Sequence, residues 1–232
     1  ARKIVTGCLL LIFICTPSFL SATDTGSKRL LTFSEIADLY SQTGLSPDLE
    51  LRLNQLLTEP FTGSADALPA MPPIASSPSL GEYIRVAQWN IQRGIEFDAL
   101  RAVFEGNDKV AALLDPVKFP VGSKARGELL EHAAMLRASD VIVLNEVDWG
   151  LKRSEYHNIP EELASMLGWN YAFGVEFVEL TPVQRSLNSG SADSTSLADE
   201  IDVERYRGLH GIAILSRFPL DNVRVIRYKN QP

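Results

Sequence analysis

The stretch of sequence that decides the fold is Val141-Ile142-Val143-Leu144-Asn145-Glu146-Val147-Asp148. It opens with an unbroken apolar run, Val141 to Leu144, which is typical of a strand covered on both faces. Glu146 comes just past this run, so we expect its carboxylate at the end of a strand, on the rim of a sheet. A second strand, expected over residues 84–90, ends in Asn90 in the same way. The two strand ends predict a polar site made of one amide and one carboxylate.

The segments around this pair alternate between strand-like and helix-like patterns. Gly168 follows an apolar periodic run and marks the end of a helix. Helices are expected over residues 98–114, 128–137 and 160–167, and strands over residues 171–180, 212–215 and 223–228. Between them, residues 181–204 are rich in Ser, Asp and Thr and predict a loop. The alternation indicates an α/β or α+β class, with helices covering sheets.

Residues 1–22 have the pattern of a targeting segment. Arg2 and Lys3 form a basic start, an uncharged apolar stretch follows, and Ser21-Ala22 supplies small residues for cleavage. This pattern predicts a cleaved signal peptide and an exported protein, periplasmic or extracellular. An uncleaved N-terminal anchor is the alternative, and the protein would then contact a membrane only through this segment.

Residues 23–58 are expected to form a helical extension, and residues 59–82 a linker. Thr32 and Glu35 can cap a helix start reciprocally. Ser46-Pro47 marks a second start, with proline at the first helical position. The linker contains five prolines together with Gly, Ser and Ala, and it shows little periodicity. It is expected to be an extended connector.

The composition limits the classes of function that the chain can have. At 45% hydrophobic residues it can bury a core, so it is not a disordered chain. The net charge of −7 disfavours tight, sequence-independent binding to duplex nucleic acid. Both cysteines, Cys8 and Cys15, lie in the expected signal segment. The remainder therefore contains no disulfide and no cysteine-ligated metal.

Taken singly, Asn90 and Glu146 each have a plain structural alternative. Asn90 can orient a phosphoryl group without adding negative charge, but it can equally be a turn residue bonded to its own backbone. Glu146 suits Mg²⁺, which prefers oxygen ligands and keeps several waters, but it can equally be an exposed acid at the start of a loop. Only their order and spacing along the chain favour the functional interpretation.

That order resembles the endonuclease/exonuclease/phosphatase superfamily, which includes DNase I-like nucleases, neutral sphingomyelinases and inositol phosphatases. The matching elements are Trp89-Asn90-Ile91, residues 140–148 and the segment from Gly208 to Leu220. The resemblance covers about residues 83–228, so residues 83–232 are assigned to this domain. It implies an α+β fold, a DNase I-like two-sheet sandwich flanked by helices.

The resemblance also implies roles for individual side chains. Glu146 would hold the divalent metal, Mg²⁺ or Mn²⁺, and Asn90 would orient the scissile phosphate or a catalytic carboxylate. Arg153 could reach the phosphate, although a surface arginine is the alternative. His210 lies where many relatives have a Tyr or His near the phosphate; otherwise it is a strand-edge histidine. The substrate would be a phosphoester, whether nucleic acid, phospholipid or inositol phosphate, and no stable protein partner is implied.

The chain departs from the family pattern in its later motifs. The resemblance calls for an Asp-x-Asn motif and a terminal Asp-His motif, and neither occurs in the 232 residues. We therefore expect the chain to supply the N-terminal half of the domain, and to be inactive by itself. The activity expected of the full-length protein is Mg²⁺-dependent phosphoester hydrolysis. The alternative is a non-catalytic secreted binding or scaffold protein that keeps the fold.

Overall fold

The computed structural model of the chain describes residues 30–41, 44–64, 72–180 and 201–227. The expected signal segment lies outside these residues, as does most of the loop expected over residues 181–204. The described part contains helices and two separate sheets, and this confirms the α+β class. None of its helices is long and apolar enough to cross a membrane.

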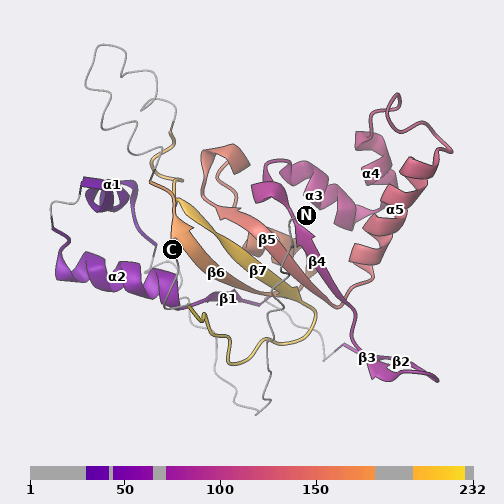
Figure 1. Cartoon of the computed structure of the whole chain (residues 1–232), viewed down its shortest axis with the longest axis horizontal. Coiled ribbons are helices and arrows are strands. Elements are labelled where there is room, and N and C mark those ends of the chain that lie inside the picture. Colours follow the sequence, from indigo (N-terminus) through magenta and orange to yellow (C-terminus); the bar gives the residue numbers. More distant parts are fainter. Residues whose placement is uncertain (1–29, 42–43, 65–71, 181–200, 228–232) are drawn as a thin grey trace, which may run out of the picture.

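The main sheet has five strands in the order β1-β6-β7-β5-β4 (Figure 1). Strands β4 and β5 are parallel, and the other neighbours are antiparallel. The strand bounds are β1 Phe61–Gly63, β4 Val86–Asn90, β5 Val141–Trp149, β6 Asn170–Val178 and β7 Leu209–Ser216. The parallel pair places the carboxyl ends of β4 and β5 at the same edge of the sheet.

One face of this sheet carries the core. Ile142, Leu144 and Leu215 point to this face and are fully buried. Helices α3 and α6 pack against it, because Leu100 and Leu163 belong to the same cluster of buried residues. The opposite face of β5 and β7 also carries apolar side chains, but these are only half-buried; they are Val141, Val143, Ile212 and Ile214.

The helices largely follow the expected pattern, with two differences at their ends. The helix expected over residues 98–114 is broken in two at Gly106, whose φ of 140° is a conformation that other residues rarely adopt. The helix expected from residue 128 begins at Lys124, because the Ser123 hydroxyl caps it by accepting a hydrogen bond from the backbone of Arg126. The observed helices are α3 Phe97–Glu105, α4 Asn107–Leu113, α5 Lys124–Arg137 and α6 Ile159–Leu167.

The N-terminal helices, α1 Phe33–Ser41 and α2 Pro47–Thr58, begin as the sequence predicts. The Thr32 amide donates to the Glu35 carboxylate at 2.8 Å, and the Glu35 amide donates back to the Thr32 hydroxyl at 3.3 Å. Ser46 caps α2, accepting from the backbone of Leu49. Both helices contribute buried side chains to the main core, so they pack on the domain as part of it.

The structure differs from the sequence-based predictions in the expected linker and in the last expected strand. Within the expected linker, Phe61 is only 2% exposed, and β1 pairs with β6 as an edge strand of the main sheet. A small hairpin, β2 Ala75–Ser77 with β3 Gly81–Tyr83, follows it. The strand expected over residues 223–228 is wrong over its described part, since residues 223–227 are irregular. They pair with no described strand.

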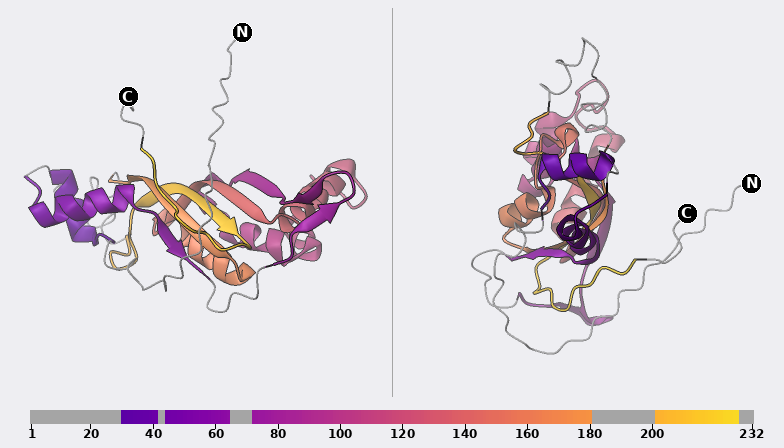
Figure 2. Two further views of the ribbon diagram at one scale, coloured as in Figure 1. Left: turned by 90° about the horizontal axis from the view of Figure 1, so that it is seen from below. Right: turned by 90° about the vertical axis from the view of Figure 1, so that its left-hand side faces the viewer.

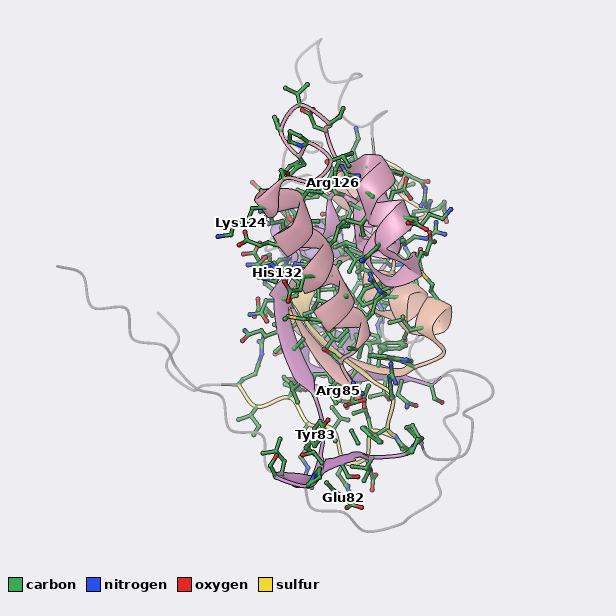
Figure 3. All side chains as sticks on the ribbon, turned by 90° about the vertical axis from the view of Figure 1, so that its right-hand side faces the viewer. Glu82, Tyr83, Arg85, Lys124, Arg126 and His132 are labelled. Carbon is green, nitrogen blue, oxygen red and sulfur yellow. The ribbon has the colours of Figure 1, made fainter. Side chains whose placement is uncertain are left out.

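The elements are spread along the long axis of the molecule (Figure 2). Helices α1 and α2 lie at one end of the sheet, α4 and α5 lie at the other, and the main sheet lies between them. Figure 3 views the molecule from the α5 end, where Lys124, Arg126 and His132 mark α5 and Glu82 marks the hairpin. His132 is exposed on α5, as its helical position predicts.

Candidate active site

Glu146 does not lie at the end of a strand, and this corrects the sequence-based expectation. Strand β5 continues to Trp149 through a β-bulge, in which Asn145 and Glu146 lie opposite the single residue Ile212. Glu146 takes a left-handed backbone conformation there, with φ of 53°. A bulge adds a residue to one strand and redirects a side chain. It is therefore the bulge that presents this carboxylate, and apolar periodicity alone could not predict it.

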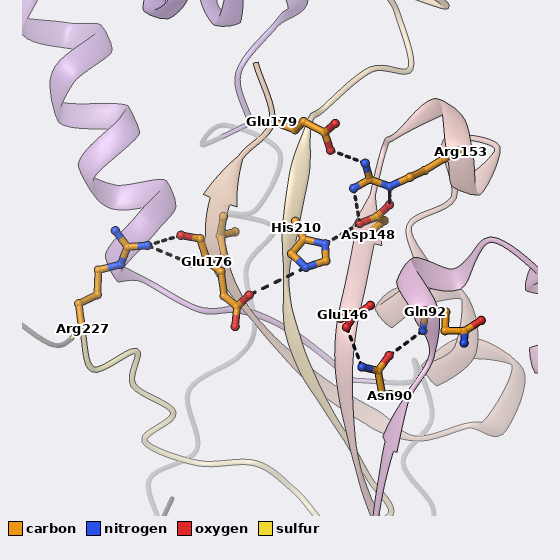
Figure 4. A network of polar contacts seen from close by, with 10 residues as sticks. Asn90, Gln92, Glu146, Asp148, Arg153, Glu176, Glu179, His210 and Arg227 are labelled. Atoms are coloured by element: carbon orange, nitrogen blue, oxygen red, sulfur yellow. Dashed lines mark hydrogen bonds and ion pairs between the residues drawn. The ribbon is translucent and has the colours of Figure 1, made fainter. Parts of the chain in front are cut away.

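The structure brings Asn90 and Glu146 into direct contact. The Asn90 amide nitrogen Nδ2 donates to Glu146 Oε1 at 2.7 Å (Figure 4). The Asn90 side-chain oxygen in turn accepts from the backbone amide of Gln92 at 2.9 Å. Asn90 pairs with Asn145 in the parallel register, so the pair sits where β4 ends, beside the bulge in the neighbouring strand β5. The Asn90 side chain is thereby oriented, with its donor on the carboxylate.

The turn after Asn90 is fixed at both of its ends. Ile91 is buried, and its amide donates to the Asn145 carbonyl at 3.1 Å. Gly94 is buried with φ of 70°, and a β-carbon there would lie 2.1 Å from Ile159 Cδ1. Between these two anchors, Gln92 and Arg93 are exposed and also have positive φ, 50° and 66°. The local sequence thus places glycine where the backbone meets α6.

His210 lies in a buried polar network next to this pair. Its register partner on β5 is Asp148, and His210 Nδ1 lies 2.7 Å from Asp148 Oδ1. Asp148 is fully buried and His210 is 5% exposed. The Phe177 ring packs against the imidazole at 4.7 Å between centroids, and Glu176 Oε2 lies 3.9 Å from Nε2. His210 is therefore no simple strand-edge residue; it belongs to a charged cluster inside the sheet.

Arg153 belongs to the same cluster, and all of its guanidinium nitrogens have partners. Nε and Nη2 donate to the two oxygens of Asp148, at 2.6 and 3.1 Å, and Nη1 donates to Glu179 at 2.5 Å. Burial alone would lower the pKa of Arg153, but the bonds to Asp148 and Glu179 outweigh it and raise that pKa. One N–H of each guanidinium nitrogen is thus committed to Asp148 or Glu179, which ties Arg153 to this network.

Alternation along the strands puts these groups on one face of the sheet. Leu144 points to the core face, and Asn145, paired with Asn90, points to the other. Beyond the bulge, Val147 points to the core face again, and Asp148 and His210 point away from it. The Asn90–Glu146 pair and the Asp148 network therefore share the half-buried face, as Figure 4 shows.

Glu146 fits a metal ligand better than its neighbours do. It forms no ion pair within the described part of the chain, and there only Oε1 accepts a hydrogen bond. Mg²⁺ is commonly held by one or two carboxylates, with waters and substrate phosphate completing its shell. The carboxylate of Asp148, in contrast, is taken up by Arg153 and His210. Among the residues that the structure describes, no group of three or more His, Cys, Asp or Glu could enclose a metal ion.

The sequence favoured a structural role for Asp148 over a place on the rim of the site, but it did not name the partners of this residue. The structure makes Asp148 the anchor for both Arg153 and His210. The contact with Arg153 is local, five residues along the chain. The contact with His210 spans 62 residues and depends on the pairing of β5 with β7. The only signal that could have suggested this role was an aspartate expected to be buried in a strand, followed by an arginine five residues later.

The fold is an α+β domain with an amide–carboxylate contact on the half-buried face of its main sheet. The family model described as Endonuclease/Exonuclease/phosphatase family matches residues 87–231, and the chain belongs to that family. No curated protein and no solved structure matches the chain. Members of the family are generally hydrolases that act on phosphoesters and typically depend on divalent metals.

Proposed function

We propose that this protein hydrolyses phosphoesters with the help of a divalent cation, Mg²⁺ or Mn²⁺, held by Glu146. The observation that carries the proposal is the 2.7 Å hydrogen bond between Asn90 and Glu146. It joins an amide at the end of β4 to a carboxylate in the bulge of the parallel strand β5, in a chain of a hydrolase family. When bound, the cation would polarise a phosphoryl oxygen and stabilise the charge that develops as water attacks.

The protein's own residues would act by orientation and charge. Asn90 would fix the Glu146 carboxylate through Nδ2, and its own oxygen is held by the Gln92 amide. An amide adds no negative charge near an anionic substrate, whereas an aspartate at residue 90 would repel both the substrate and Glu146. The substrate class that we propose is a phosphodiester or phosphomonoester, and nucleic acid, phospholipid and inositol phosphate all have that chemistry.

We also propose that the protein is exported through residues 1–22. The support is the basic start at Arg2 and Lys3, followed by an uncharged apolar stretch. Separation of a secreted fraction, followed by N-terminal sequencing, tests this. A new N-terminus just after Ala22 is the expected result, and recovery of the protein in the cell with its first residues intact would contradict it.

The test of the hydrolase proposal is the hydrolysis of bis-p-nitrophenyl phosphate by the protein from the complete reading frame. We expect a Mg²⁺-dependent rate that Glu146→Ala lowers by at least about 100-fold, since loss of a metal ligand removes several kcal/mol of transition-state stabilisation. Glu82→Ala is the matched control, because Glu82 is an exposed glutamate on the β3 hairpin. It should leave the rate unchanged.

Two results would contradict the proposal. A rate that survives Glu146→Ala would remove this carboxylate from the chemistry. An absence of hydrolysis in the folded, metal-supplemented protein would favour the non-catalytic scaffold instead. Thermal unfolding of each variant shows whether a lost rate reflects lost structure.

A further inference from the structure

Arg93 carries a charge that no described residue neutralises. It lies three positions after Asn90, on the turn that follows β4. Its side chain is exposed, and it makes no hydrogen bond or ion pair within the described part of the chain. Most other arginines near the sheet are occupied; Arg85, Arg153 and Arg227, for example, all donate to oxygen atoms of the protein. Arg93 is thus an exposed arginine, without a partner among the described residues, on the turn that directly follows Asn90.

The backbone of this turn is held in an unfavourable conformation. Gln92 and Arg93 both have positive φ, which costs a residue with a side chain roughly 1–3 kcal/mol at each such position. The buried anchors Ile91 and Gly94 on either side impose this conformation. The Gln92 amide also donates to the Asn90 side chain, so the turn and the site residue are mechanically linked. A glycine at residue 93 would relieve the strain, yet the sequence has arginine there.

We propose that Arg93 is a substrate-binding residue, whose guanidinium contacts a phosphoryl oxygen of the phosphoester held at Asn90 and Glu146. The proposal rests on the hydrolase function proposed above. It adds to the proposed metal ion a positively charged side chain that can bind the substrate phosphate. A planar guanidinium can offer two parallel N–H donors to one phosphate, so arginine suits this role better than lysine. Arg153, for which the sequence suggested a phosphate contact, is instead paired with Asp148 and Glu179, whereas Arg93 has no ion pair among the described residues.

Steady-state kinetics with bis-p-nitrophenyl phosphate test this role. Arg93→Ala should raise KM by about tenfold, the loss expected for one charge-assisted hydrogen bond, and should change kcat much less. Arg93→Lys should restore part of the affinity, because it keeps the charge but not the paired donors. Inorganic phosphate should inhibit competitively in each variant, with an inhibition constant that Arg93→Ala raises more than Arg93→Lys does. The control is Arg101→Ala, which removes an exposed arginine paired only with acids of its own helix, α3.

The outcomes of these experiments distinguish a failure of the Arg93 proposal from a failure of the hydrolase proposal. If Glu146→Ala abolishes hydrolysis while Arg93→Ala has the KM of the unaltered protein, the inference fails and the hydrolase function stands. If no hydrolysis is found, titration of inorganic phosphate into the Mg²⁺-loaded protein, followed by the NMR signal of the Arg93 side chain, still decides it. A saturable shift of that signal supports the contact, and an unmoved signal overturns it. A purely structural Arg93 would instead lower the unfolding temperature when changed to Ala and leave KM alone.

Discussion

The two ends of the parallel β4–β5 pair are built in opposite ways. At the amino end, Arg85 and Asp140 form a closed ion pair: Arg85 Nε and Nη2 donate to the two Asp140 oxygens, each at 3.0 Å. The Arg85 backbone amide adds a third bond to Asp140 at 2.8 Å. These hydrogen bonds from Arg85 lower the pKa of Asp140, against the raising effect of burial. Both charged groups of this ion pair therefore have their partner within the protein.

At the carboxyl end, the same two strands leave groups unused. Glu146 accepts from Asn90 through one oxygen only, within the described residues, and Arg93 has no partner there. The backbone is strained at Gln92, Arg93 and Glu146, all of which have positive φ. Strained backbone conformations and polar groups without partners are concentrated at binding and catalytic sites, because they do not stabilise the fold. One end of the pair therefore stabilises the fold, and the other is free to bind a ligand.

The largest expected effect on stability comes from a substitution of Asp148. This residue lies near the carboxyl end of the β4–β5 pair, but, like Asp140 at the amino end, its carboxylate is bound by partners within the protein. Asp148→Asn removes the charge of a fully buried carboxylate that accepts two hydrogen bonds from Arg153 and lies against His210, and it leaves Arg153 with Glu179 as its acidic partner. Removal of one partner from a buried ion pair costs about 3–5 kcal/mol, so the free energy of unfolding in urea should fall by that order. Asp98→Asn is the control, since the Asp98 side chain is 93% exposed. An equal, small effect of both changes would show that the Asp148 network is not structural.

A smaller effect, dependent on pH, is expected at the amino end. Folding lowers the pKa of Asp140 below the pKa that it has in the unfolded chain, which is near 3.8. The ionised carboxylate therefore stabilises the folded protein at pH values above the unfolded pKa. This stabilisation is lost as the pH falls through the pKa of the folded state. Asp140→Asn should cost about 1–2 kcal/mol at neutral pH, because Arg85 is partly exposed. In strong acid the two proteins should converge in stability. Parallel curves across the whole pH range would contradict this.

The smallest effect expected is a gain in stability at the carboxyl end. Glu146→Gly removes a left-handed strain of roughly 1–2 kcal/mol and adds a chain-entropy cost of roughly 0.5–1 kcal/mol, for a net gain of up to about 1 kcal/mol. Thermal unfolding measures it. Hydrolysis should be lost in the same variant, so that stability and activity move in opposite directions. A clear loss of stability would mean that the Glu146 side chain is needed for the fold.

Much of the fold could be predicted from the sequence, because its signals are local. Thr32 with Glu35 marks the start of α1, Ser46 marks that of α2, and Gly168 ends α6 as predicted. The apolar run from Val141 predicts β5. The strand prediction for residues 223–227 was wrong because a strand needs a pairing partner, and the pattern of a segment does not say whether one is beside it.

The site could be predicted in part. The sequence predicted that Asn90 and Glu146 lie close together, and the parallel pairing of β4 with β5 brings them into contact, although only Asn90 lies at a strand end. The bulge that presents Glu146, and the capture of Arg153 by Asp148, depend on long-range pairing and burial. Arg93 passed unnoticed because its distinguishing property, the lack of a partner among the described residues, exists only in three dimensions.

The most direct test of the contrast between the two ends is Mn²⁺-induced line broadening of backbone amides in NMR spectra of the protein. The account predicts that substoichiometric Mn²⁺ broadens residues 90–92 and 145–147 first, spares Arg85 and Asp140, and that Glu146→Ala removes the effect. Mn²⁺ takes the oxygen ligands that suit Mg²⁺, so it reports the same site. Broadening centred on the Asp140 end, or broadening that persists without the Glu146 carboxylate, would contradict the assignment of the metal to this end of the strands.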